Sequence, residues 1–245
     1  MTVTATDYTL DLPAQLPAGS VTLNLVNQGK ELHQAMVVRL EDGKTVADLA
    51  HGMAAEGQTP AWLEFIGGPN AAAPGMATNA SSDLAPGHYA VVCFIPSPDG
   101  TPHLMKGMIR PFEVVAGSGT VSGQLPEADD TVTMAEYSFA PAHPLTPGRH
   151  TILVENMGEQ PHELVLLQLA PGKSAEDFAQ WGLGGMKGPP PALPLGGVGF
   201  LGKGGRGVFA VALPAGDYAF ICFAPDAKDG KPHLMHGMMM QVRVG

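Results

Sequence analysis

The chain has 245 residues, enough for one large domain or for two of about 100–150 residues each. Hydrophobic residues make up 44% of the chain and charged residues only 15%, which argues against a disordered protein, while 32 Gly and 23 Pro favour turns over long helices. The net charge of −10, without a cluster of Lys or Arg, excludes a typical nucleic-acid-binding protein. Because the many Gly and Pro residues favour turns over long helices, we expect an all-β protein.

Membrane insertion and a disulfide framework are not expected either. No apolar run approaches the roughly 18–20 residues that span a bilayer, so we expect no membrane span. No basic segment followed by an apolar one opens the chain, so no signal peptide is visible. The two cysteines are too few for a disulfide framework.

Strands dominate the expected elements. Alternating or β-branched runs predict strands at residues 21–26, 35–40, 89–95 and 109–115, and again at 151–154, 164–169, 218–223 and 239–244. A short helix is expected in each half, capped by Thr45 with Asp48 and by Ser174 with Asp177, because these pairs have the spacing of a capping box. The Gly/Pro-rich stretches 67–87 and 182–207 are expected to be long surface loops.

An internal duplication organises the chain. Residues of the same type recur 129 positions apart, from Tyr8 and Tyr137 through to Cys93 and Cys222, and 130 positions apart after the cysteines. We predict two copies of one domain, at residues 1–116 and 129–245, with residues 117–128 as a Gly/Ser-rich linker.

Each copy contains one His, one Cys, a second His and a Met in the same order. The predicted metal ligands are His33, Cys93, His103 and Met108 in the first copy and His162, Cys222, His233 and Met238 in the second. Two imidazoles, one thiolate and a weak thioether suit a blue-copper electron-transfer site, because the sulfur ligands are soft and imidazole accepts both copper oxidation states.

In three motifs the sequence resembles the cupredoxins. These are Asn-x-Gly-x-x-x-His (Asn27 to His33, Asn156 to His162), Gly-x-Tyr-x-x-x-Cys (Gly87 to Cys93, Gly216 to Cys222) and Cys…His-x-x-x-x-Met. The resemblance implies two tandem Greek-key β-sandwiches, up to two copper ions, and a redox partner protein or a copper donor or acceptor. It also implies a periplasmic or extracellular location.

The sequence departs from the usual family pattern between the Cys and the second His. Residues 94–102 intervene in the first copy and residues 223–232 in the second, which is long for this family. Each loop contains Asp-Gly, a strong turn signal, and at least two prolines. We expect stiff, hairpin-like loops that can return the His to the Cys.

Two alternatives to a copper electron-transfer or copper-handling protein remain open. A Cys in an apolar strand is often a small buried hydrophobe, and Met often fills gaps, so the sandwiches can be metal-free structural or interaction modules. An enzyme that uses copper or a long-loop pocket is a third hypothesis. The multicopper branches of the family need further histidines, typically in H-x-H pairs, and this chain has no H-x-H. We therefore do not expect their chemistry.

Overall fold

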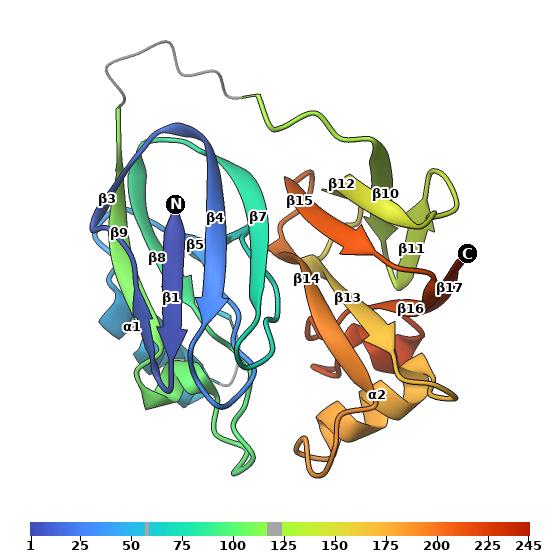
Figure 1. Cartoon of the computed structure of the whole chain (residues 1–245). Coiled ribbons are helices and arrows are strands. Elements are labelled where there is room, and N and C mark those ends of the chain that lie inside the picture. Colours follow the sequence, from blue (N-terminus) through green and yellow to red (C-terminus); the bar gives the residue numbers. More distant parts are fainter. Residues whose placement is uncertain (57–58, 117–123) are drawn as a thin grey trace.

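Two β-sandwiches lie side by side in the protein (Figure 1). The computed structural model describes residues 1–56, 59–116 and 124–245, so the predicted linker at 117–128 lies outside the described residues up to position 123. The predicted all-β class with short helices is confirmed. None of the described helices is long and apolar enough to cross a membrane.

The elements of residues 1–115 precede a similar series in residues 129–245. The first series is β1 (Thr2–Thr6), β2 (Thr9–Asp11), β3 (Gln15–Pro17), β4 (Gly19–Asn27), β5 (Met36–Leu40), α1 (Val46–Glu56), β6 (Leu63–Gly67), β7 (Ala77–Leu84), β8 (Gly87–Val92), the 3-10 helix η1 (His103–Lys106) and β9 (Ile109–Val115). The second is β10 (Asp130–Ala135), β11 (Ser138–Pro141), β12 (Gly148–Asn156), β13 (His162–Leu169), α2 (Ala175–Leu183), β14 (Ala192–Leu201), β15 (Arg206–Leu213), β16 (Gly216–Ile221), η2 (His233–His236) and β17 (Met239–Val244). The described residues of the second series show no counterpart of β3.

Both predicted helix caps are present. The Ser174 hydroxyl accepts a hydrogen bond from the Asp177 amide, and the Asp177 carboxylate accepts one from the Ser174 amide. Thr45 and Asp48 make the same reciprocal pair at the start of α1. Each pair satisfies backbone donors that a helix start would otherwise leave free.

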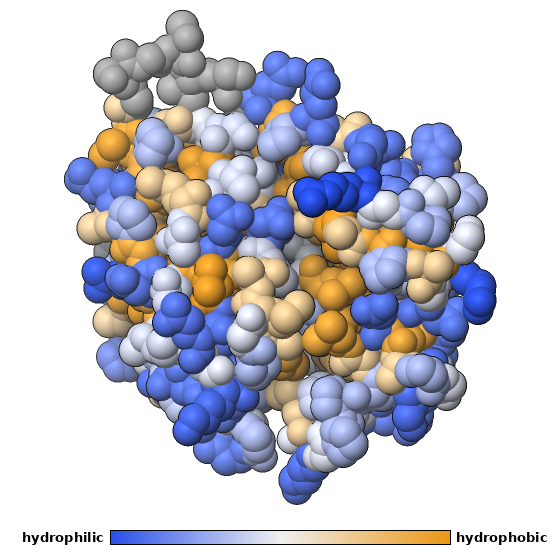
Figure 2. Space-filling view, in the orientation of Figure 1, coloured by the Kyte–Doolittle hydropathy of each residue, from blue (hydrophilic) through white to orange (hydrophobic). Residues whose placement is uncertain are grey.

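Both sheets continue from one half of the chain into the other. One has the strand order β11-β10-β12-β15-β7-β4-β1-β2, and the other β17-β16-β13-β14-β6-β5-β8-β9-β3. The halves meet where β15 pairs with β7, at Val208 and Ser81, and where β14 pairs with β6, at Leu201 and Ile66. The largest hydrophobic cluster contains residues of both halves, and Figure 2 shows apolar surface on both sides of their boundary. The two sandwiches therefore share a core.

The prediction of long surface loops at 67–87 and 182–207 was wrong. The first stretch contains β7, and the second contains all of β14 and the start of β15. Their glycines are required for close packing: a Cβ on Gly197 would lie 2.0 Å from the Leu164 carbonyl oxygen, and one on Gly199 would lie 2.8 Å from that of Gly67. These buried strands form the junction between the halves, so their composition reflects tight strand contact.

Gly197→Ala is expected to destabilise the protein by roughly 3 kcal/mol or more, because the new methyl group overlaps a buried backbone oxygen. Gly204→Ala is the control: its backbone is also left-handed, at φ +72°, but no atom lies within 4 Å of the added Cβ. It should cost only about 1–2 kcal/mol. Urea unfolding measures both, and equal losses would contradict the packing role of Gly197.

Candidate metal centres

The first His of each half is held by an Asn-x-Gly turn. The Asn27 amide donates to the carbonyls of Glu31 and Ala72, both at 2.8 Å, and its oxygen accepts from the Gly29 amide at 2.8 Å. A Cβ on Gly29 would lie 2.6 Å from His33 Nε2, so only glycine lets the turn approach the ring so closely. Asn156 and Gly158 repeat this arrangement beside His162.

The long loops between Cys and the second His are hairpins, as expected. Pro96 pairs with Pro102, and Pro225 with Pro232. Each hairpin returns its His to the Cys: the amide of the residue after His103 donates to the Cys93 carbonyl at 2.9 Å, and the same bond after His233 reaches the Cys222 carbonyl at 3.0 Å. The extra loop length thus leaves the His and Cys adjacent.

A single 3-10 turn then brings each Met beside its Cys. Gly107 and Gly237, at φ +101° and +95°, end these turns in the left-handed region that favours glycine. The Met108 carbonyl accepts from the Cys93 amide at 3.1 Å, and the Met238 carbonyl from the Cys222 amide at 3.2 Å. Both methionines are fully buried.

The structure brings the predicted imidazoles and thiols together in two buried groups. In the first, His33 Nδ1 lies 3.2 Å from His103 Nδ1, which lies 3.3 Å from Cys93 Sγ. In the second, the two Nδ1 atoms of His162 and His233 are 2.9 Å apart, and Cys222 Sγ lies 3.6 Å from His233 Nδ1. All six side chains are 0% exposed.

These separations fit a shared metal ion. Nitrogen ligands at about 2.0 Å and a sulfur at about 2.3 Å around one tetrahedral ion lie about 3.3 Å (N to N) and about 3.5 Å (N to S) apart. Within each group the three ligand atoms all lie within 4.8 Å of one another. The donor set of two imidazoles and one thiol, turned inward in a dry pocket, can therefore hold a soft or borderline metal ion.

Carboxylates hold the outer nitrogens of the first group. Asp7 Oδ1 lies 2.7 Å from His33 Nε2, and Glu31 Oε2 lies 2.8 Å from His103 Nε2. The Tyr8 hydroxyl donates to the other oxygen of Glu31 at 2.8 Å. Burial opposes both negative charges, but the Lys30 amide and His33 hold the pKa of Asp7 below its usual value, and His103 and Tyr8 do the same for Glu31. Each imidazole is thus fixed in orientation.

In the second group the carboxylates lie farther from the imidazole nitrogens than in the first group. One of the two also comes from a different position in the sequence. Glu136 Oε1 lies 3.9 Å from His162 Nε2, and Asp226 Oδ2 lies 3.9 Å from His233 Nε2. Neither Nε2 atom has a hydrogen-bond partner among the described residues. Gln160 occupies the position equivalent to Glu31, and Asp226 the position equivalent to Ser97. The acid that faces the second His therefore lies in the turn before the first His in the first half, and in the Cys-to-His loop in the second half. Its carboxylate accepts bonds from Tyr137 and Gln160.

Sequence reasoning missed most of these outer residues. Asp7 and Glu136 lie more than twenty residues before their histidines, and Asp226 lies in a loop whose length differs by one residue between the halves. Glu31 lies two residues before His33, but nothing in the sequence assigns it to His103. The available signal was the pair of Tyr residues, Tyr8 and Tyr137, each preceded directly by an acid in both halves.

This chain resembles known proteins only among the solved structures. No protein-family model and no curated protein matches it. Among solved structures, reduced auracyanin from Roseiflexus castenholzii is 21% identical over 47% of this chain and 94% of its own, with a TM-score of 0.35. A Cu-containing nitrite reductase from Thermus scotoductus SA-01 aligns over all of this chain and 61% of its own, with 14% identity and a TM-score of 0.29. Both are cupredoxin-fold proteins, the family that the sequence motifs of this chain resemble.

Burial controls the protonation of both thiols. It raises the pKa of the Cys93 thiol to about 12 and the pKa of the Cys222 thiol further still. The amides of Gln34 and Glu163 each donate to a cysteine Sγ at 3.5 Å. Without a metal ion, both cysteines are therefore neutral thiols at pH 7.

The buried histidines make the metal-free chain acid-sensitive. Burial, with His233 nearby, lowers the pKa of His162 from 6.5 to about 4, and burial also lowers the pKa of the other three buried histidines. Between these values the unfolded state binds more protons than the folded state, so stability is complete above pH 6.5 and decreases as pH falls toward 4. His162 alone should account for about 3 kcal/mol of that loss.

Urea unfolding in a chelator at pH 7.5, 5.5 and 4.5 measures this loss. His162→Gln, which cannot take up a proton in this range, should have a shallower pH dependence over the same interval. An identical pH dependence in the variant would contradict the role of His162.

Proposed function

We propose that the chain is a copper-binding electron-transfer or copper-handling protein with up to two mononuclear centres. The proposed ligands are His33, Cys93, His103 and Met108 in the first centre and His162, Cys222, His233 and Met238 in the second. The observation that carries this proposal is the convergence of two imidazole Nδ1 atoms and one thiol in each of two buried groups.

The donor chemistry favours copper. A thiolate and a nearby thioether are soft ligands, and imidazole suits both Cu(I) and Cu(II). When bound, copper would supply one-electron exchange between these two states. Neutral thiols in the metal-free chain mean that binding must displace a proton from each cysteine, so copper affinity should rise with pH.

The surrounding residues favour a rigid, dry ligand set. The backbone of each Met is bonded to its Cys and to the His that starts the 3-10 turn, with Met108 and Met238 donating to His103 and His233 at 2.9 and 3.0 Å. The amides of Gln34 and Glu163 point at the sulfur atoms and would stabilise thiolate charge. A set of ligands that cannot rearrange needs little reorganisation when an electron arrives or leaves.

The carboxylate arrangement also supports function over inert packing. In both halves a carboxylate faces each outer imidazole nitrogen, although one of the two comes from different positions. Copying an inert domain would preserve positions. Here the sequence position of one carboxylate differs between the halves, but in both halves a carboxylate lies near each imidazole.

One segment links the two groups. Ala72 exchanges backbone hydrogen bonds with His33, at 2.8 and 3.2 Å. The side-chain amide of Asn70 donates to Oε2 of Glu163, the residue after His162, at 2.8 Å. Electrons can pass between centres along such bonded routes, so we propose that the two centres exchange electrons within one chain.

We further propose that residues 1–116 and 129–245 arose by internal duplication, with 117–128 as their linker. The resemblance of the sequence to the cupredoxins supports a location in the periplasm or outside the cell. It also supports a redox protein, or a copper donor or acceptor, as the partner of this chain.

Redox cycling tests this function. The chain is loaded with Cu(II), reduced with ascorbate and reoxidised with ferricyanide while the visible thiolate-to-copper band is recorded. We expect the band to disappear and return over repeated cycles without loss of copper. Failure of the band to return, or oxidation of the thiols, would contradict an electron-transfer role.

A further inference from the structure

An apolar cavity of about 370 Å³ lies between the two halves and is lined by residues that adjoin the proposed ligands in the sequence, among them Gln34, Phe94 and Glu163. Prolines of both Cys-to-His hairpins line it, as does α2, which lies at the same end of the molecule as these loops (Figure 1). Aromatic rings form much of its wall. Phe94 of the first half stacks on Phe200 of the second, with ring centroids 6.2 Å apart, and Phe178 contacts Phe223 edge-on at 6.3 Å. This volume and lining are typical of a small-molecule site.

Two buried polar side chains also line this cavity. Glu163 is 3% exposed and Gln34 is 6% exposed. One oxygen of Glu163 accepts from the Phe223 amide at 3.0 Å and the other from Asn70 at 2.8 Å. The Gln34 side chain has no hydrogen-bond partner among the residues that the structure describes. Its polar atoms are not among the buried atoms without a partner, so they remain accessible at the cavity wall and can bond a ligand.

The carboxylate of Glu163 has no counter-charge. No Lys, Arg or His lines the cavity, and within the described part of the chain no cation forms an ion pair with Glu163. The hydrogen bond to the cysteine does not require an acid here, because the backbone amide of Gln34, at the equivalent position of the first half, makes the same hydrogen bond to Cys93 Sγ. Both protein donors to Glu163 are neutral, so this buried acid at the wall of an apolar cavity can accept further bonds from the N–H groups of a cationic ligand.

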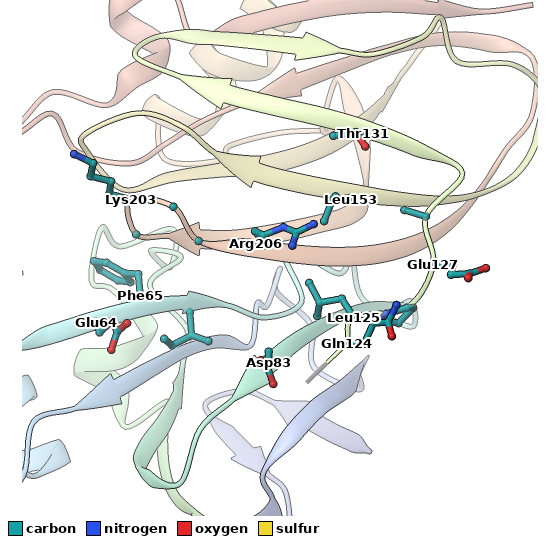
Figure 3. A pocket seen from close by; sticks show the side chains of 16 residues that line it. Glu64, Phe65, Asp83, Gln124, Leu125, Glu127, Thr131, Leu153, Lys203 and Arg206 are labelled. Carbon is teal, nitrogen blue, oxygen red and sulfur yellow. The ribbon is translucent and has the colours of Figure 1, made fainter. Parts of the chain in front are cut away.

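The larger cavity between the halves differs in this respect. It has about 700 Å³, and Figure 3 shows Lys203 and Arg206 along it, across from Glu64 and Asp83. Its two basic residues already have partners: Lys203 pairs with Glu159 at 2.7 Å, and Arg206 with Glu155 at 2.8 Å. Both basic residues of this cavity are therefore already paired within the chain.

We propose that the apolar cavity binds a small organic ammonium ion. Its apolar body would lie among Phe94, Phe178, Phe200 and Phe223, where aromatic faces also attract a cation. Its N–H groups would donate to the Glu163 carboxylate and to the Gln34 side-chain oxygen. The inference does not depend on the proposed copper centres, since the metal-free chain has this cavity.

Trp181, which lines the cavity, provides the readout. The only other tryptophan is Trp62, so Trp62→Phe leaves one reporter. The metal-free Trp62→Phe chain is titrated with phenethylammonium, 2-phenylethanol and phenylacetate, which share one apolar body. We expect saturable binding of the ammonium, with a dissociation constant at least tenfold below that of the alcohol, and weaker binding of the carboxylate. Equilibrium dialysis provides an independent measurement.

Variants then test Glu163. In the same background, Glu163→Gln should abolish the preference for ammonium over alcohol and leave alcohol binding unchanged. Glu176→Gln removes the same charge from an exposed position on α2 and should retain the preference. If Glu163→Gln does not fold, the comparison of the three ligands in the Trp62→Phe chain still tests whether the cavity prefers an ammonium ion. No saturable response, equal affinities for ammonium and alcohol, or a preference that survives Glu163→Gln would overturn the proposal.

Discussion

Cys93→Ser and Cys222→Ser should each remove half of the thiolate-to-copper absorption of the copper-loaded chain, and the double variant should remove all of it. The serine hydroxyl cannot replace the thiolate as a soft, charge-donating ligand, although it occupies nearly the same volume in the fully buried pocket. Absorption at saturating Cu(II), with bound copper counted by metal analysis, measures the effect.

Folding controls are necessary because both cysteines lie in hydrophobic clusters. Far-UV circular dichroism and the urea midpoint of the metal-free variants should stay close to those of the unsubstituted chain. If either single variant retained the full absorption, its cysteine would not be a copper ligand. The corresponding group would then be a structural core.

The second large effect concerns the carboxylates behind the histidines. In the Cys222→Ser background, where only the first centre forms, Asp7→Asn should lower copper affinity about tenfold to a hundredfold. The reason is that Asp7 Oδ1 lies 2.7 Å from His33 Nε2, so its charge makes the imidazole a stronger donor. Asparagine retains the shape and removes the charge. Competition with a chelator of known affinity measures the change.

The second half contains the matched control. In the Cys93→Ser background, Glu136→Gln should lower copper affinity by less than about threefold, because Glu136 lies 3.9 Å from His162 Nε2 and makes no hydrogen bond with it. The two centres should therefore differ in their response to the same chemical change. Equal losses in both halves would show that the distances to the outer nitrogens do not control affinity.

The sequence predicted the fold class and the inner residues of both groups because these depend on local patterns. Strand periodicity located β4, β5, β8 and β9 and their second-half equivalents, and the turn signals in residues 94–102 predicted the hairpin that returns His103 to Cys93. The repeated order of His, Cys and His made each group visible without knowledge of distances.

Features that depend on contact between distant segments were not predicted. The Gly-rich composition of β14 indicated a loop, but its glycines lie against backbone oxygens of neighbouring strands. The shared core and the continuous sheets arise from pairing across the two halves, which no periodicity within one half reports. Asp7 and Asn70 reach their partners over separations of 26 and 93 residues.

Copper stoichiometry tests the central claim most directly. The reduced chain is titrated anaerobically with Cu(I) against a competing chelator, then oxidised and examined by absorption and electron paramagnetic resonance. The proposed ligand sets predict two tightly bound copper ions per chain, each with thiolate coordination once oxidised. A chain that binds no copper tightly, with both thiols still free, would contradict the account and leave a pair of fused sandwiches without a metal.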